Sequence, residues 1–329
     1  MTNTLQHQSA IIIAGMHRSG TSLTASLLQN AGIDIGDRLM DANTGNIKGH
    51  FEDLDFVEFH QNVLQSQGIS IAGWTEQDSI EVQQQYLTIA QNLISARKNK
   101  DIWGWKDPRT TLFLNFWSEL IPDAKYIFVY RSPWEVVDSL FRRGDVIFRK
   151  NPNFAVKQWC IYNQAILDFY QRKPEQCLLL DITGIIRHPE LIVNSIEQKW
   201  KLKLRSPESI YEPSLFTVDD KKHYRQALIV KFFPQAIDLY DRLQEQNDGD
   251  NSVHPEALAV DSTCKSWILQ DWIDFQQTST QKQQTETHLT QTQQQLQSKD
   301  AELIQIQQQL QSKDAELIQI QQQLQSKDA

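Results

Sequence analysis

The stretch AIIIAGMHRSGTSLTASLL, residues 10–28, decides the fold. It starts with a short apolar run typical of a buried strand, continues through a loop that holds Gly15 and Gly20, and ends in a helical pattern. Glycines at this spacing occur in phosphate-binding loops, where they let the backbone turn tightly and expose consecutive N–H groups. The following helix would offer the positive end of its dipole to an anion. The stretch predicts a strand–loop–helix unit that binds an anion; the competing interpretation is an ordinary glycine turn.

The side chains of this loop indicate which kind of anion it binds. Thr21 stands where a nucleotide triphosphatase carries its lysine, and the nearest cation is Arg18, in the middle of the loop. Thr21 and Ser22 add hydroxyl donors. A second apolar run, YIFVY at 126–130, is followed by Arg131 and not by a metal-holding aspartate. The loop therefore fits an anionic nucleotide without bound magnesium better than it fits ATP.

A second candidate anion site lies in the stretch YRSPWEVVDS, residues 130–139. Arg131 follows a buried strand, so its charge needs a partner or a cleft. Ser132 is placed to be the N-cap of a helix, and Ser139 lies two helical turns further on, on the same face. The arginine and the serine could grip one phosphate. The alternative, with equal weight, is a structural ion pair and a surface serine.

The order of the apolar segments predicts an α/β fold. Strands alternate with helices, which implies a central parallel sheet with helices on both faces and a ligand site at the carboxyl ends of the strands. The expected strands cover 10–14, 126–130 and 177–181, and the expected helices cover 21–32, 132–143 and 188–200.

Composition excludes several classes of function. The net charge of −9 and the pI of about 5.4 argue against a general nucleic-acid binder. The three cysteines are scattered, with no CxxC pair, so neither a disulfide framework nor a zinc site is indicated. No secretory signal and no apolar run of roughly 20 residues is present, which predicts a cytoplasmic protein without a membrane span.

The C-terminal part of the chain has a different pattern. The sequence QQQLQSKDAELIQI at 293–306 is repeated without change at 307–320, and leucines recur every seventh residue from Leu289. Isoleucine and lysine alternate three residues after these leucines, which predicts a coiled coil with a weakened seam and a homo-oligomer; a disordered glutamine-rich segment is the alternative. We expect three regions: an α/β domain at 1–245, a linker with an amphipathic helix at 246–285, and a coiled coil at 286–329.

Together, the two candidate anion sites resemble the sulfotransferase family, in its bacterial branch. The resemblance covers roughly residues 10–205 and includes GHFED (49–53), WGWKDPR (103–109) and RHPELI (187–192). It implies 3′-phosphoadenosine 5′-phosphosulfate as co-substrate and no metal. The residues that it assigns to the co-substrate are Gly15, Arg18, Ser19, Gly20, Thr21 and Ser22 for the phosphosulfate and Arg131 and Ser139 for the 3′-phosphate.

The candidates for the chemistry lie in two further motifs. Glu52 is favoured as the base that takes the acceptor proton, with His50 beside it if the segment is extended; alternatively, Glu52 is a first-turn acid of a helix. Lys106 is a candidate to hold the sulfuryl oxygens. Asp107 could orient Lys106 or Arg109, act as an alternative base, or form only a structural ion pair. Of the two tryptophans in WGWKDPR, core packing is expected for at least one, while stacking on a sugar or adenine stays open.

The leading prediction is a sulfotransferase that acts on an acceptor hydroxyl, which we expect on a glycan. Two alternatives remain at this level. One is a P-loop kinase or nucleotide triphosphatase, and the other is a coiled-coil scaffold with an inactive α/β domain.

Overall fold

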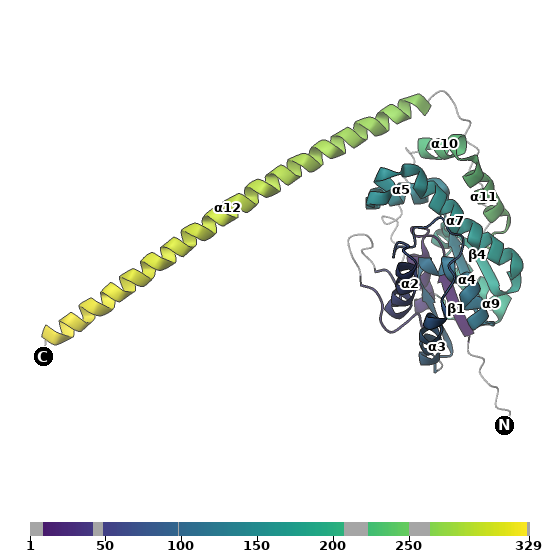
Figure 1. The fold of residues 1–329 in the computed structure, drawn as a ribbon, viewed down its shortest axis with the longest axis horizontal. Coiled ribbons are helices and arrows are strands. Elements are labelled where there is room, and N and C mark those ends of the chain that lie inside the picture. Colours follow the sequence, from purple (N-terminus) through teal and green to yellow (C-terminus); the bar gives the residue numbers. More distant parts are fainter. Residues whose placement is uncertain (1–8, 42–48, 98, 207–222, 250–263, 328–329) are drawn as a thin grey trace. The chain divides into compact units, whose positions relative to one another are not determined.

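The computed structural model describes residues 9–41, 49–97, 99–206, 223–249 and 264–327. The chain divides into a globular unit, Met1–Val260, and a second unit, Asp261–Ala329 (Figure 1). Each unit is described by itself below.

A four-stranded parallel sheet forms the centre of the globular unit. The strand order is β2-β1-β3-β4, so the strand that begins the phosphate-loop stretch lies inside the sheet. The three predicted strands are confirmed. The fourth, β2, was not predicted, although it contains the first four residues, WGWK, of the WGWKDPR motif. The strands are β1 (Ser9–Ala14), β2 (Ile102–Lys106), β3 (Lys125–Tyr130) and β4 (Cys177–Asp181).

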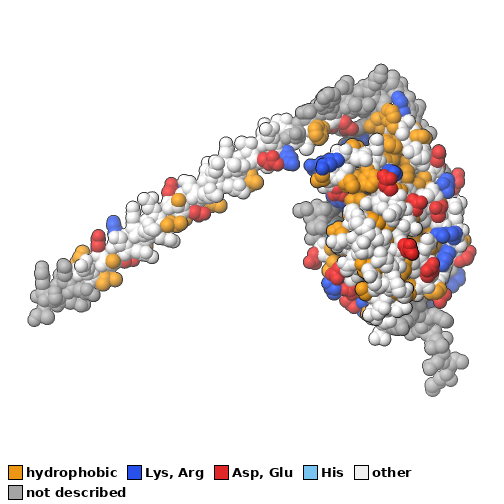
Figure 2. All heavy atoms as spheres, viewed as in Figure 1, with side chains coloured by type: hydrophobic (Ala, Val, Ile, Leu, Met, Phe, Trp, Pro, Cys, Tyr) orange, Lys and Arg blue, Asp and Glu red, His pale blue; other side chains and the backbone are white. Residues whose placement is uncertain are grey.

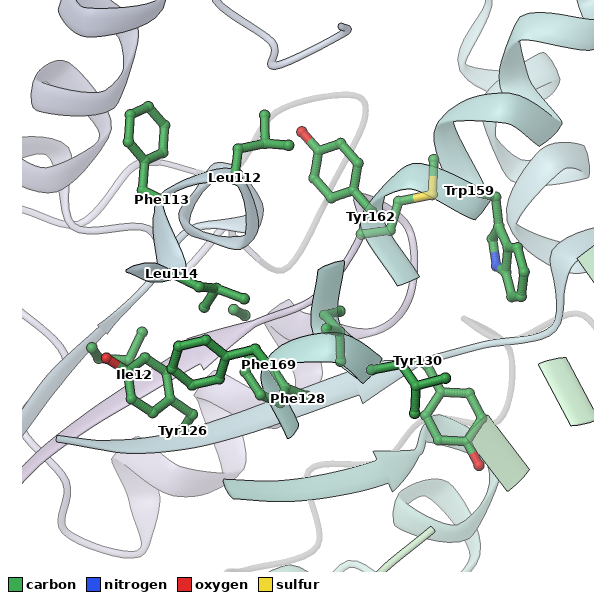
Figure 3. Close-up of a cluster of buried hydrophobic side chains, with 14 of the residues drawn as sticks. Ile12, Leu112, Phe113, Leu114, Tyr126, Phe128, Tyr130, Trp159, Tyr162 and Phe169 are labelled. Atoms are coloured by element: carbon green, nitrogen blue, oxygen red, sulfur yellow. The ribbon is translucent and has the colours of Figure 1, made fainter. Parts of the chain in front are cut away.

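Helices cover both faces of this sheet, as predicted. Alternate residues of each strand point to opposite faces, so that Ile12 belongs to one buried cluster and Ile13 to the other. The cluster with Ile12 holds most of the aromatic side chains of the core, including Tyr126 and Phe128 of β3 (Figure 3). Helices α1 (Thr21–Asn30), α8 (Ile182–Arg187) and α9 (Glu190–Trp200) cover one face, and α2 (Leu54–Ser66), α4 (Leu114–Leu120), α7 (Pro152–Arg172) and α11 (Pro234–Glu245) cover the other.

The described part of the globular unit contains seven further helical segments. Three of these, α5, α6 and α10, matter for the functional site. Helix α5 follows β3, as predicted. The bounds of the segments are α3 (Leu87–Ala96), α5 (Pro133–Arg143), α6 (Val146–Lys150), α10 (His223–Phe232), η1 (Gln84–Tyr86), η2 (Pro108–Phe113) and η3 (Pro174–Gln176).

Both tryptophans of β2 are core residues. Trp105 is fully buried, stacks on Phe56 with ring centroids 4.0 Å apart, and donates its indole N–H to the Thr110 hydroxyl at 3.0 Å. Trp103 is also buried. The predicted possibility that either ring stacks on a sugar or an adenine is therefore wrong, because both rings are buried among apolar neighbours.

The first residues of the predicted linker pair with the edge of the sheet. The Asp248 N–H donates to the Leu179 carbonyl at 2.8 Å, and the Asp248 carboxylate accepts from the Leu179 N–H at 2.9 Å. The Asn247 side-chain oxygen accepts from the Asp181 N–H at 3.1 Å. These bonds use the open hydrogen-bonding edge of β4 and protect it from pairing with another strand.

The described residues of the second unit form one helix, α12 (Cys264–Lys327), which would be about 96 Å long at 1.5 Å per residue. It runs through 285–286, where the sequence predicted a change from linker to coiled coil. The leucines at seven-residue spacing from Leu289 to Leu317 are more than half exposed, and Figure 2 shows hydrophobic side chains at intervals along an otherwise polar helix. Most side chains in the first part of the predicted linker with its amphipathic helix, from 250 to 273, lie outside those that the structure describes.

In the ranges that the structure describes, no helix is long and apolar enough to cross a membrane.

Candidate functional site

The loop between β1 and α1 runs against the end of β3. At Gly15 the backbone approaches β3 so closely that a Cβ atom would lie 2.3 Å from the Val129 carbonyl oxygen. Gly20 has a φ of 98° and Arg18 a φ of 70°. A left-handed conformation is unusual for arginine and occurs often at functional sites. The sequence predicted the turn at the glycines but not the left-handed conformation at Arg18.

The loop and the start of α1 carry donors that suit an anion. Gly20 is the N-cap of α1 and has no side chain to bond the first N–H groups of the helix. The Ser19 hydroxyl is buried and has no hydrogen-bond partner among the described residues. Thr21 and Ser22 line the adjoining cavity, and the Ser22 hydroxyl donates to the His50 carbonyl at 3.1 Å. A buried hydroxyl in this position fits a phosphate or sulfate oxygen.

The two predicted anion sites meet directly. The Arg18 Nε donates to the Ser139 hydroxyl at 2.8 Å, although the residues are 121 positions apart. Arg131 instead contacts Glu135 at 3.0 Å, one turn further along α5. Ser132 occupies the N-cap position of α5, as predicted, but its hydroxyl donates to the Glu135 carboxylate and does not cap the helix.

Four arginines surround this meeting point, and we call them the arginine cluster: Arg18, Arg131, Arg142 and Arg143. Burial lowers the pKa of Arg18, and the charges of the other three arginines lower it further. Burial also lowers the pKa of Arg142, with Arg131 as the second cause. The like charges therefore lie close enough to act on one another, and a bound anion would relieve their repulsion.

Carboxylates hold three members of the arginine cluster in place. Arg142 pairs with Asp138 at 3.1 Å, and Arg225 of α10 contacts the same carboxylate. Arg143 pairs with Asp145 just beyond the end of α5. The charges of Arg142 and Arg143 are thus partly neutralised.

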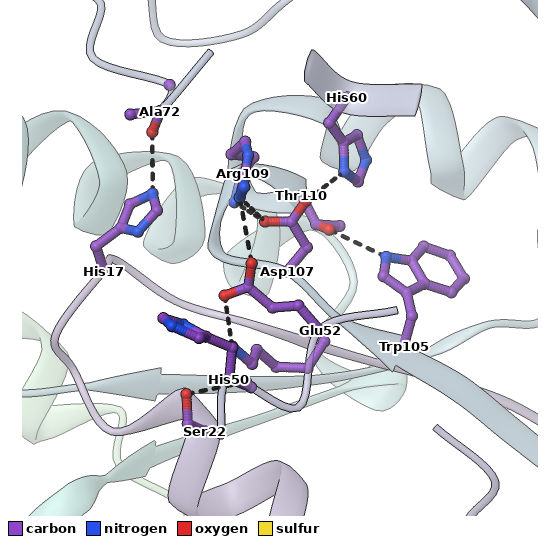
Figure 4. Close-up of polar contacts among 12 residues, drawn as sticks. His17, Ser22, His50, Glu52, His60, Ala72, Trp105, Asp107, Arg109 and Thr110 are labelled. Carbon is purple, nitrogen blue, oxygen red and sulfur yellow. Dashed lines mark hydrogen bonds and ion pairs between the residues drawn. The ribbon is translucent and has the colours of Figure 1, made fainter. Parts of the chain in front are cut away.

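A second group of charges lies at the carboxyl end of β2, and we call it the charge network: Glu52, Lys106, Asp107, Arg109 and His60. The Lys106 ammonium contacts one Glu52 oxygen at 2.8 Å, and Arg109 contacts the other at 3.4 Å. Arg109 also contacts Asp107 at 2.8 Å, and the other Asp107 oxygen meets His60 Nδ1 at 2.8 Å. Figure 4 shows Glu52, Asp107 and Arg109 converging on one another. Acidic and basic groups alternate along the whole network.

The far end of the network determines how His60 is protonated. The Trp117 indole N–H donates to His60 Nε2 at 2.9 Å, so His60 carries its proton on Nδ1 and donates it to Asp107. Burial lowers the pKa of His60 and outweighs the opposite effect of Asp107. Burial by itself would raise the pKa of Asp107, but Arg109 and the hydrogen bond from His60 outweigh burial and lower it well below its ordinary value.

These contacts bear differently on the roles predicted for Asp107. Its carboxylate caps η2 by accepting from the Arg109 N–H at 3.0 Å, and it is fully buried. It does not line the cavity described below. The structure shows the ion pair between Asp107 and Arg109, and a lowered pKa suits a permanent anion better than a base; the role of Asp107 in the reaction stays a prediction.

Glu52 lies before helix α2 and not in its first turn. Asp53 is the N-cap, and the helix begins at Leu54, so the interpretation of Glu52 as a first-turn acid is wrong. The segment is also not extended, because Phe51 has a φ of 52°. Even so, His50 and Glu52 both line the cavity. Burial lowers the pKa of His50, and its buried Nε2 has no partner in the part of the chain that the structure describes.

A cavity of about 770 Å³ joins the loop to the charge network. It is lined on one side by Arg18, Thr21 and Ser22 and on the other by Glu52, Lys106 and Arg109. The cavity thus brings together three of the six predicted loop residues and three of the four candidates for the chemistry, His50, Glu52 and Lys106. The predicted 3′-phosphate residues Arg131 and Ser139 do not line it.

Sequence reasoning missed His17, His60, Trp117 and Glu135. His17 lies inside the loop and bonds the Ala72 carbonyl at 3.0 Å through Nε2, and burial lowers its pKa well below the ordinary value. Its position in the loop was a signal that could have been used. His60 gave no local signal, because its partner Asp107 is 47 residues away.

Among the described residues, no group of three or more histidine, cysteine, aspartate and glutamate side chains is arranged to hold a metal ion.

Comparison with known proteins identifies the family. The sulfotransferase family matches residues 10–206, and the chain belongs to this family. No curated protein matches the sequence.

Two solved structures with low sequence identity are also similar. One is a sulfotransferase domain from the olefin synthase of Synechococcus PCC 7002, with 15% identity, a TM-score of 0.40, and coverage of 78% of this chain and 85% of that one. The other is a sulfotransferase from Alicyclobacillus acidocaldarius, with 15% identity, a TM-score of 0.43, and coverage of 74% and 97%.

Proposed function

We propose that the protein transfers a sulfuryl group from 3′-phosphoadenosine 5′-phosphosulfate to an acceptor hydroxyl. The observation that carries this proposal is the bond between Arg18 and Ser139, which joins the loop motif to the second anion motif inside a cluster of four arginines. Two anion sites side by side suit a ligand with two phosphate groups. A single phosphate would need only one of them.

The residues present fit this co-substrate. The uncapped start of α1 and the buried Ser19 hydroxyl provide donors for the phosphosulfate end. Arg131 and Ser139 would hold the 3′-phosphate, with Glu135 giving up Arg131 as the phosphate binds. When bound, the co-substrate supplies a sulfuryl group attached to a phosphate that leaves with a negative charge. Arg18 and the loop N–H groups would stabilise that charge.

Lys106 and Arg109 would act on the group in transit. Both line the cavity, and Glu52 holds each of them in position. Their positive charges would lie against the oxygens of the sulfuryl group as it passes from the phosphate oxygen to the acceptor oxygen. Because these side chains are already placed, little reorganisation would be needed in the transition state.

The acceptor must lose its hydroxyl proton as the new sulfur–oxygen bond forms, and two residues can take it. Glu52 is the base favoured by the sequence, but both of its oxygens contact cations. His50 is the alternative, because burial favours its neutral form and its Nε2 has no partner in the described ranges. We keep Glu52 as the base in this proposal, with His50 tested beside it.

Neither alternative function has an observation in its favour. A kinase or nucleotide triphosphatase would need a cation where Thr21 stands and a metal-holding acid where Arg131 follows β3. An inactive α/β domain would not be expected to keep a cavity that joins the anion site to paired cations.

We further propose that the chain assembles with itself through α12 in the cytoplasm. The support for assembly is the exposed leucine row, which would bury its side chains against the same row of a second copy. Replacing Lys299 and Lys313 with isoleucine should strengthen the assembly in sedimentation experiments, and Leu310→Asp should weaken it. Gln297→Lys, one residue after a seam leucine, is the control.

Binding measurements test the proposed function. In calorimetry, 3′,5′-adenosine bisphosphate should bind at least about tenfold more tightly than ADP. A difference of this size corresponds to roughly one additional charge-assisted hydrogen bond, here to the 3′-phosphate. Addition of magnesium should not change the affinity for the bisphosphate. Equal affinities, or a requirement for magnesium, would contradict the proposal. A transfer assay with radiolabelled co-substrate then tests turnover.

A further inference from the structure

The cavity has an aliphatic rim, which lies near His17 of the loop. Ile71, Val146 and Ile147 line the cavity and have exposed fractions of 50%, 62% and 38%. The globular unit has only six exposed large hydrophobic side chains among its described residues, and these three are half of them. The others are Ile89, Phe141 and Phe232. Such clustering at the mouth of a cavity is typical of a binding site for an apolar group.

Buried aromatic side chains support the segments that carry this rim. Trp74 packs against Phe148 of α6 with ring centroids 5.0 Å apart, which joins the segment around Ile71 to the helix that carries Val146. The Tyr162 hydroxyl donates to the Gly73 carbonyl at 3.0 Å. The aliphatic side chains therefore face the cavity on supported elements, and their exposure does not come from a loosely packed loop.

The cation and the aromatic ring beside this rim already have partners within the protein. The cation, Arg143, is paired with Asp145 and lies over the Trp74 ring, 5.4 Å from the centroid. The Trp74 ring itself is buried, with His17 at 4.7 Å on another side. The cavity lining also includes the polar side chains of Gln61 and Ser70, but the exposed large side chains at its mouth are branched hydrocarbon.

We infer that the acceptor is an alcohol on an aliphatic skeleton, such as a lipid or hydroxyacyl chain. Its hydroxyl would reach Glu52 and His50, and its hydrocarbon part would lie against Ile71, Val146 and Ile147. The glycan expected from the sequence is thus replaced by an amphiphilic acceptor. The inference rests on the proposed function, because it assigns the acceptor side of the same cavity.

In chemical terms the step is balanced without any further reactant. The acceptor oxygen forms a bond to sulfur, and the bond between sulfur and the phosphate oxygen breaks. The hydroxyl proton goes to the base, and the products are a sulfate ester and 3′,5′-adenosine bisphosphate.

A series of straight-chain alcohols tests the inference on the full chain. With the co-substrate present, kcat/KM should rise about two- to fourfold per added methylene from 1-butanol through 1-hexanol to 1-octanol, because each buried methylene contributes to binding. Maltohexaose should be a poor acceptor. Equal kcat/KM for the three alcohols, or higher kcat/KM for maltohexaose, would overturn the inference.

Variants locate the effect. Ile71→Ser and Val146→Ser change exposed side chains and should flatten the dependence on chain length, while Ile89→Ser, an equally exposed isoleucine outside the cavity, should leave it unchanged. All three should bind 3′,5′-adenosine bisphosphate as the natural chain does.

The failure of the inference can be told apart from the failure of the proposed function. If the natural chain does not bind 3′,5′-adenosine bisphosphate, the proposed function is contradicted. If the bisphosphate binds but no alcohol is converted, calorimetry of 1-octanol with the bisphosphate-bound protein decides. Saturable binding that is lost in Val146→Ser supports the inference, and its absence overturns it.

Discussion

The charge network and the arginine cluster both contribute side chains to one cavity, but their charges are arranged differently. In the charge network, acids and bases alternate, and each carboxylate contacts at least one cation directly. In the arginine cluster, Arg18 is surrounded by three side chains of its own sign. In the first region every carboxylate is paired directly with a cation. In the second, carboxylates pair Arg131, Arg142 and Arg143, but the like charges of these three arginines still lower the pKa of Arg18, and a bound anion would offset that effect.

This difference assigns separate tasks to the two regions. A network that is already balanced keeps Lys106 and Arg109 fixed, which is what stabilising a transition state requires. When a phosphate binds to a cluster of positive charges, the free energy of the system falls, and this favours binding of the ligand in its ground state. Changes in the charge network should therefore lower kcat, and changes in the arginine cluster should lower affinity.

The largest effect is expected for Glu52→Gln. The amide cannot take a proton and no longer pairs with Lys106 and Arg109 as an anion, so kcat should fall about 10²–10⁴-fold while bisphosphate affinity stays within about twofold. Transfer assays and calorimetry measure the two quantities.

His50→Gln identifies the base. If Glu52 is the base, His50→Gln should keep most of the turnover. If His50→Gln causes the larger loss and Glu52→Gln turns over normally, Glu52 is excluded from the mechanism.

The next largest effect is expected for Arg131→Ala. Loss of a charge-assisted contact to the 3′-phosphate should weaken 3′,5′-adenosine bisphosphate about 10- to 100-fold. Binding of a ligand without the 3′-phosphate, such as AMP, should change little. Arg187→Ala, which removes an exposed arginine on α8, is the matched control. Unchanged bisphosphate affinity in Arg131→Ala would contradict the division of tasks and favour a structural role for the ion pair with Glu135.

The sequence predicts the arginine side of the site much better than the network side. Gly15, Arg18 and Gly20 lie within six residues, and Arg131 follows an obvious strand, so short-range patterns place both motifs at the edge of the sheet. The bond between Arg18 and Ser139 itself needed the fold, because it depends on how α5 packs beside the loop.

The charge network has no comparable short-range pattern. Glu52 and Lys106 are 54 residues apart, and His60 meets Asp107 across 47. Strand β2 was missed as well, because glycine and lysine interrupt its apolar run. Without β2, nothing in the sequence placed Lys106 at the carboxyl end of a strand inside the same cavity.

A smaller effect on turnover is expected for His60→Gln. His60 does not line the cavity, so it acts only through Asp107, which in turn holds Arg109. We expect kcat to fall roughly tenfold with little change in KM, and the unfolding free energy to fall by about 2 kcal/mol because buried Asp107 and Trp117 lose a partner. A purely structural role would lower stability without lowering kcat in the fraction that remains folded. His60→Asn, which keeps an amide donor closer to the Nδ1 position, should recover part of kcat.

The smallest effect is a change of stability with pH. The folded-state pKa values of His17 and His60 lie below the ordinary value of 6.5, so below this pH the unfolded chain binds protons that the folded chain does not. The unfolding free energy should therefore decrease as pH falls from 6.5 to 5.5, by about 1 kcal/mol for each histidine at most. Urea unfolding followed by near-ultraviolet circular dichroism at several pH values measures the slope. His60→Gln should reduce the slope, whereas Trp117→Phe, which also destabilises the network but keeps the imidazole, should retain most of it. If the slope is the same in His60→Gln and in the natural chain, burial does not keep His60 neutral. The conclusion that the charge network is balanced before any ligand binds would then not hold for His60.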